Sequence, residues 1–175
     1  MATKAKPLDE EGLMNYAAQR LTARALSVSE LRTRLRARAA HAADVDKVVG
    51  RLKDAGILSD QRFAGAFADW RKQNQGFGKA RVLRDLMARK VAPAVAQKAV
   101  ETAYQGTDET AMIEDYLKRK YRGKDLRALL QEEKHLASAF RRLRSAGFSA
   151  GASIRTLKRY AAQAEQLEDM EEASE

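Results

Sequence analysis

Apolar residues recur along the chain at the spacing of an amphipathic helix. The positions i, i+3, i+4 and i+7 are apolar in two successive segments: Val45, Val48, Val49 and Leu52, and then Phe63, Ala66, Phe67 and Trp70. Strand-like runs of alternating β-branched and aromatic residues are absent from the sequence. The pattern therefore predicts an all-α chain.

Helix caps and breakers divide this chain into about nine predicted helices. Ser27 is a typical N-cap, and Asp60 is expected to cap the helix that begins beside it. Pro93 suits the first turn of a helix, and Gly147 suits the left-handed residue that often follows a helix end. One long helix is predicted over residues 124–145.

Three of the predicted helices share a pair of apolar residues four positions apart, surrounded by arginines. The pairs are Leu31 with Leu35, Val82 with Leu86, and Ala139 with Leu143. Their spacing of about 50 residues is typical of repeat arrays. It predicts three tandem three-helix repeats, at residues 9–58, 59–105 and 106–164, followed by an acidic tail at 165–175. Because one such repeat buries little surface alone, we expect the repeats to stack into an elongated, curved array.

The charge of the chain points to a polyanionic partner. It carries 33 Lys+Arg against 24 Asp+Glu, a formal net charge of +9. The last 11 residues hold six acids and no base, so the rest of the chain carries about +15. Such an excess is typical of proteins that bind nucleic acids or nucleoproteins.

No arrangement of residues suggests catalysis, a cofactor or a metal. Cysteine is absent, and the two histidines, His41 and His135, lie in no metal-ligand spacing. Gly76-Phe77-Gly78-Lys79 is better explained as a turn between helices than as a phosphate loop, because no strand precedes it. We therefore expect a binding protein and not an enzyme. The sequence has no signal peptide and no membrane-spanning run, so we expect a cytoplasmic protein. We also expect it to be a monomer.

The arginines beside the three apolar pairs are candidates for a contact surface. Because the apolar pairs face inward, we expect the guanidinium groups to reach solvent, where their planar fork suits phosphate or carboxylate. Trp70 and Phe77 flank two further basic residues, Arg71 and Lys72. Trp70 also continues an apolar stripe, so it is expected to be buried. The candidate partner-binding or DNA-binding residues are Arg32, Arg36, Arg71, Lys72, Lys79, Arg81, Arg84, Arg141, Arg142 and Arg144.

Several segments resemble the RecX family of bacterial regulators of the RecA recombinase. They are residues 25–35, 56–63, 76–86 and 143–149, and the resemblance extends over residues 13–160 in the family's order. The residues that carry the family motifs are Asp60, Arg62, Phe63, Gly78, Gly147 and Phe148.

The resemblance implies a right-handed array of three-helix repeats that lies in the groove of the RecA–DNA filament. There it would inhibit ATP hydrolysis, strand exchange and filament growth, and so modulate DNA repair and recombination. Two alternatives stay open from the residues alone. One is a nucleic-acid-binding protein that acts on DNA directly, and the other is a helical scaffold for an acidic protein.

Overall fold

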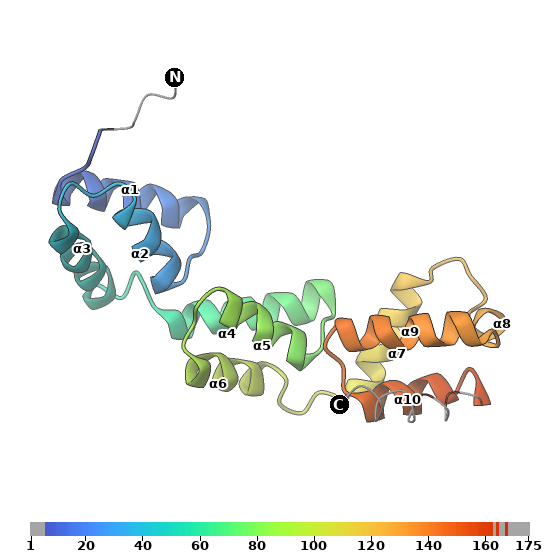
Figure 1. Cartoon of the computed structure of the whole chain (residues 1–175). Coiled ribbons are helices and arrows are strands. Elements are labelled where there is room, and N and C mark those ends of the chain that lie inside the picture. Colours follow the sequence, from blue (N-terminus) through green and yellow to red (C-terminus); the bar gives the residue numbers. More distant parts are fainter. Residues whose placement is uncertain (1–5, 163, 165–166, 168–175) are drawn as a thin grey trace, which may run out of the picture. The chain divides into compact units, whose positions relative to one another are not determined.

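The protein is all-helical in the part of the chain that the structure describes, a computed structural model covering residues 6–162, 164 and 167 (Figure 1). The prediction of an all-α chain is confirmed. An isolated β-bridge joins Leu8 to Ala39, and no strand forms among these residues. No helix among them is long and apolar enough to cross a membrane.

Ten α-helices and one π-helix follow one another along the described residues. They are α1 Glu10–Ala23, α2 Val28–Arg36, α3 Ala42–Asp54, α4 Asp60–Trp70, the π-helix η1 Arg71–Gln75, α5 Lys79–Ala88, α6 Pro93–Ala103, α7 Glu109–Lys120, α8 Leu126–Leu130, α9 Glu133–Ser145 and α10 Ala150–Lys158.

These helices form two compact units. The N-terminal unit contains Met1–Phe67 and Asp85–Ala99, and the C-terminal unit contains Ala68–Arg84 and Val100–Glu175. The division passes through α4, α5 and α6, so each of these helices contributes residues to both units. The division of the sequence into three repeats remains a prediction.

Each unit has its own apolar core. In the N-terminal unit, α1, α2 and α3 bury a cluster that includes Leu13, Leu31 and Val48, all 0% exposed. In the C-terminal unit, helices α7 to α10 bury a second cluster around Leu117 and Phe148. The six residues of the three predicted apolar pairs are all 0% exposed, which confirms that these pairs face inward.

Helix ends follow the predicted capping chemistry at two positions. The Ser27 hydroxyl accepts a hydrogen bond from the Glu30 N–H, and the Glu30 carboxylate accepts one from the Ser27 N–H, which completes a capping box. Gly147 has φ +92° after α9, and the Phe148 N–H donates to the Leu143 carbonyl. This is the Schellman arrangement that favours glycine.

The expected role of Asp60 is wrong. The N–H of Arg62 donates to the Ser59 hydroxyl, so Ser59 provides the side-chain cap of α4. Asp60 is the first residue of α4, and its carboxylate accepts from the N–H of Val28, the first residue of α2, at 2.8 Å. Asp60 therefore caps a helix 32 positions earlier in the chain, a pairing that local sequence patterns do not reveal.

Two predicted helices are also interrupted. The helix expected over residues 124–145 ends at Leu130 and restarts at Glu133, and the Gln131 side chain donates to the Tyr160 carbonyl at 2.9 Å. No glycine or proline marks this break in the sequence. The contact that accompanies it is with a residue distant in the sequence, so local patterns do not reveal it. The helix that begins at Asp60 leaves α geometry after Trp70 and continues as the π-helix. The predicted acidic tail lies outside the described residues except for Leu167.

Candidate functional site

The most tightly constrained site in the C-terminal unit is the junction between the start of α5 and the end of α9. The N–H of Gly78 donates to the Ala146 carbonyl at 2.9 Å, and the N–H of Ala80 donates to the Gly147 carbonyl at 3.2 Å. A Cβ atom added at Gly78 would lie 2.2 Å from the Gly147 carbonyl oxygen. The two backbones therefore meet at a distance that only glycine permits.

Arginines reinforce this junction. Arg81 and Arg84 both donate to the carbonyl of Ser145, at 3.2 and 3.4 Å. Cationic groups at the carboxyl end of a helix are favourable because they meet the negative end of its dipole. A third arginine, Arg144, donates to the Phe148 carbonyl at 2.6 Å. These three candidate contact residues therefore also hold the fold together.

Lys72 likewise has partners within the C-terminal unit. Its Nζ donates to the Ala103 carbonyl and to the Thr107 hydroxyl, both at 2.7 Å, and lies 5.3 Å from the centre of the Tyr104 ring. The Tyr104 hydroxyl in turn donates to the Phe77 carbonyl, and burial raises the pKa of Tyr104. Lys72 and Tyr104 thus fix the end of α6 against the segment that follows the π-helix.

Trp70 is not buried, which corrects the sequence-based expectation. Its side chain is 51% exposed at the end of α4, because the buried face of this helix runs through Phe63, Ala64 and Ala68 and leaves Trp70 at its edge. The guanidinium carbon of Arg71 lies 6.0 Å from the Trp70 ring centre and 5.5 Å from that of Phe77. Arg81 lies 4.9 Å from the same Phe77 ring.

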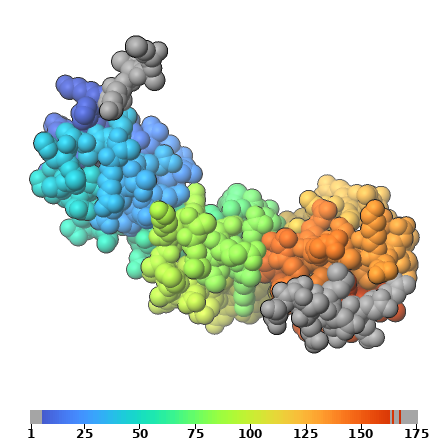
Figure 2. Space-filling model, in the orientation of Figure 1, coloured from blue at the N-terminus to red at the C-terminus, as the bar shows by residue number. Residues whose placement is uncertain are grey.

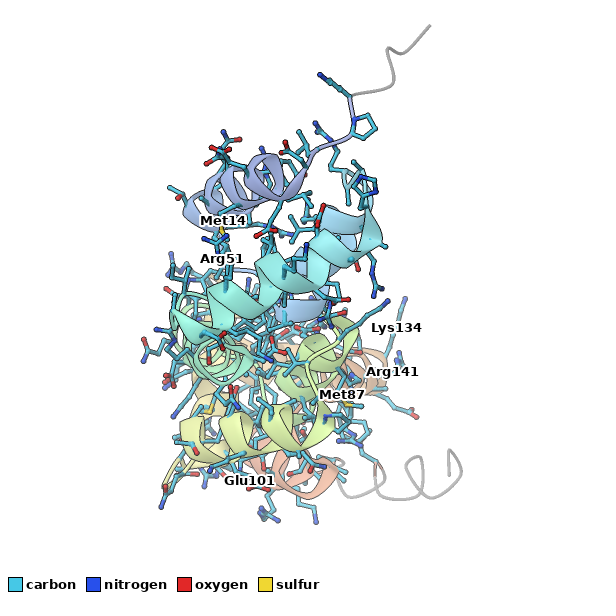
Figure 3. The ribbon with its side chains drawn as sticks, turned by 90° about the vertical axis from the view of Figure 1, so that its left-hand side faces the viewer. Met14, Arg51, Met87, Glu101, Lys134 and Arg141 are labelled. Carbon is cyan, nitrogen blue, oxygen red and sulfur yellow. The ribbon has the colours of Figure 1, made fainter. Side chains whose placement is uncertain are left out.

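The remaining candidate cations differ in how far they reach solvent. Arg32 forms a surface ion pair with Asp46 at 2.9 Å, an interaction that contributes little to stability. Arg142 is exposed and lies 5.9 Å from the Tyr121 ring centre. Figure 2 shows side chains of α5 in green and of α9 in orange on the visible surface, and Arg141 extends outward from α9 in Figure 3. The exposed candidates are Arg36, Lys79, Arg84, Arg141 and Arg142.

In the N-terminal unit, several polar contacts join α2 to the residues after α5. The Ser27 hydroxyl donates to the Arg89 carbonyl at 2.8 Å, and the Arg89 side chain forms an ion pair with Glu30 at 3.4 Å. The same guanidinium carbon lies 5.2 Å from the ring centres of both Phe63 and Phe67. Phe63 itself is buried, whereas Arg62 is exposed and donates to the Gly56 carbonyl.

Comparison with known proteins shows which proteins this chain resembles. Residues 59–100 match the family model of the second three-helix domain of RecX. Regulatory protein RecX of Pseudomonas fluorescens (strain SBW25) is 31% identical over 94 residues, which cover 54% of this chain and 59% of that protein. The chain is therefore similar to RecX over these residues, and the match spans less than two thirds of the relative's own length.

Two crystal structures show the same RecX fold. RecX from Lactobacillus salivarius has a TM-score of 0.66 and 15% identity, over 86% of this chain and 96% of that one. A second crystal structure, of a regulatory protein RecX, has a TM-score of 0.61 and 13% identity, over 84% of this chain and 72% of that one.

Most of the residues that carry the resemblance to RecX have structural roles. Asp60 and Phe63 contact residues of α2 or Arg89 within the N-terminal unit, and Gly78, Gly147 and Phe148 form the junction in the C-terminal unit. Sequence reasoning did not predict that Ser27, Glu30 and Arg89 take part in the contacts of the N-terminal unit. Their partners lie about 60 positions away along the chain, so no local pattern could have found them.

Proposed function

We propose that this protein binds the RecA–DNA filament and inhibits RecA ATP hydrolysis, strand exchange and filament growth. The observation that carries this proposal is the match of residues 59–100 to the second three-helix domain of RecX. The Pseudomonas fluorescens relative is described as a regulatory protein, which agrees with a binding protein and not an enzyme. We further propose that it acts in the cytoplasm as a monomer.

The exposed cations on the apolar-paired helices are the groups that would contact this partner. Arg36 lies on α2, Lys79 and Arg84 on α5, and Arg141 and Arg142 on α9, and all five side chains are exposed. A filament presents the same acidic or phosphate groups at regular intervals. A chain with cations on three helices gains avidity when several of them bind at once, so isolated RecA subunits should bind more weakly.

Co-sedimentation with RecA filaments on DNA tests the proposal. Lys79 and Arg141 are the cleanest targets, because among the residues that the structure describes neither side chain forms a hydrogen bond or ion pair whose loss would disturb the fold. The double variant Lys79→Glu/Arg141→Glu should bind the filament about tenfold more weakly, a loss of about 1.4 kcal/mol. Its melting temperature should stay near that of the parent.

A matched control separates position from net charge. The double variant Lys98→Glu/Arg127→Glu makes the same charge change at two other exposed cations, one on α6 and one on α8. It should bind the filament like the parent. Equal weakening by both double variants would contradict a defined docking surface, and equal affinity for naked DNA and for the filament would favour a DNA-binding protein instead.

A further inference from the structure

One aromatic side chain is exposed among the residues that the structure describes. Trp70 is 51% exposed, whereas the other aromatic side chains of its helix, Phe63 and Phe67, are buried or half-buried. An indole side chain has a large apolar face that is favourable to cover, so a half-exposed tryptophan is a frequent anchor for a bound partner.

The surroundings of Trp70 alternate aromatic rings with guanidinium groups. The Arg71 guanidinium carbon lies 6.0 Å from the Trp70 ring centre and 5.5 Å from that of Phe77, and the Arg81 guanidinium carbon lies 4.9 Å from the same Phe77 ring centre. All four residues belong to the C-terminal unit. Stacking between cations and rings at these distances holds the side chains in place before any ligand arrives.

The charge of this segment is of one sign. Residues 70–84 carry five basic side chains and no acidic one. Three consecutive amide side chains, Gln73, Asn74 and Gln75, follow within or beside the π-helix, and the left-handed Gly76, at φ +61°, ends it. π-Helices are rare and occur often at functional sites. The segment therefore combines an exposed ring, positive charge and amide hydrogen-bonding groups.

We propose that Trp70 is a stacking site for an unpaired base of single-stranded DNA, with Arg71 and Arg81, the cations of the same cluster, near its phosphates. Single-stranded nucleic acids bind by base stacking on aromatic rings beside a positively charged track. An acidic protein segment would satisfy the arginines but would leave the indole face uncovered, so the exposed ring favours a base. This proposal does not depend on RecA, and its failure would leave the proposed function standing.

The single tryptophan of the chain makes the site directly observable. Full-length protein is titrated at low salt with oligodeoxythymidylate of about 20 nucleotides, longer than most single binding sites for such strands. We expect quenching of the Trp70 fluorescence as the strand binds. An abasic strand of equal length and charge should quench little and bind about tenfold more weakly, because it has nothing to stack.

Variants test the same site by anisotropy of a labelled oligodeoxythymidylate. Trp70→Ala should weaken binding about tenfold, whereas Trp70→Phe keeps an aromatic face and should weaken it less. Met87→Ala removes another exposed apolar side chain, 48% exposed, and should bind like the parent. Circular dichroism checks that each variant is folded.

Three results would overturn the proposal. They are equal affinity for the abasic strand, parental affinity of Trp70→Ala, and Trp70 quenching by RecA protein alone but not by the oligonucleotide. The last result would instead assign the indole to a protein contact.

Discussion

Replacement of Gly147 by alanine tests the junction between α5 and α9 most sharply. Gly147 combines two constraints, a left-handed backbone with φ +92° and close contact with another helix. A Cβ atom there would lie 2.2 Å from the Arg81 backbone nitrogen and 2.8 Å from the Gly78 carbonyl oxygen. Neither neighbour is a flexible side-chain end, so the backbones must separate.

The size of the effect follows from these two constraints. A non-glycine residue in the left-handed region costs about 1 kcal/mol. Separation of the backbones would also break the two hydrogen bonds that Gly78 and Ala80 donate, each worth about 1 kcal/mol net. We therefore expect Gly147→Ala to lower the free energy of unfolding by about 3 kcal/mol. Gly78→Ala, which adds the close contact without the left-handed backbone, should lower it by about 2 kcal/mol.

Substitutions at two other glycines separate the cost of the left-handed backbone from the cost of the close contact. Gly106 has φ +67° with no atom within 4 Å of an added Cβ, so Gly106→Ala should cost only the backbone strain of about 1 kcal/mol. Gly50 lies inside α3 with equally open space and no positive φ, so Gly50→Ala should stabilise the protein by about 0.5–1 kcal/mol. Urea unfolding followed by far-ultraviolet circular dichroism measures the series. If Gly147→Ala is no more destabilising than Gly106→Ala, the helices do not meet as closely as described.

Four further substitutions test other contacts. Asp60→Ala should cost about 1–2 kcal/mol in urea unfolding, because the Val28 N–H loses a charged acceptor, and Ser59→Ala should cost about 1 kcal/mol as an ordinary cap; equal, negligible effects would contradict both roles. Phe63→Ala should cost about 3–5 kcal/mol, and a small loss would place the ring on the surface. Burial raises the pKa of Tyr104, so the folded chain holds this proton more tightly than the unfolded chain; stability should fall as pH rises above the ordinary value of 10.0, and Tyr104→Phe should remove that part of the slope. An identical pH profile for Tyr104→Phe and the parent would contradict burial as the cause.

Helical periodicity predicted most of the local structure. Residues such as Leu31, Val82 and Leu143 face the cores because their spacing matches the helical repeat, and this spacing is visible in the sequence alone. The Ser27 cap and the left-handed Gly147 were predicted for the same reason, since capping involves residues a few positions apart. Local chemistry was sufficient wherever both partners of an interaction lie within one helical turn or so.

Contacts between residues distant in the sequence account for features that the sequence did not predict. The carboxylate of Asp60 binds α2 and not its own helix, and the break after Leu130 accompanies a hydrogen bond to Tyr160. Trp70 is exposed although its spacing fits a stripe, because the buried face of α4 runs through Phe63, Ala64 and Ala68 and leaves Trp70 at its edge. Arg81 and Arg84 appeared from the sequence to be purely contact residues, and the carbonyl of Ser145 gives them a second role.

The proposal that this chain regulates RecA is tested most directly by measuring DNA-dependent ATP hydrolysis by RecA. The hydrolysis rate is measured on single-stranded DNA while the protein is added below equimolar amounts. We predict inhibition well before one molecule is present per RecA subunit, with weaker inhibition by Lys79→Glu/Arg141→Glu than by the parent. An unchanged hydrolysis rate at equimolar protein, under conditions in which the parent chain is folded, would contradict the account.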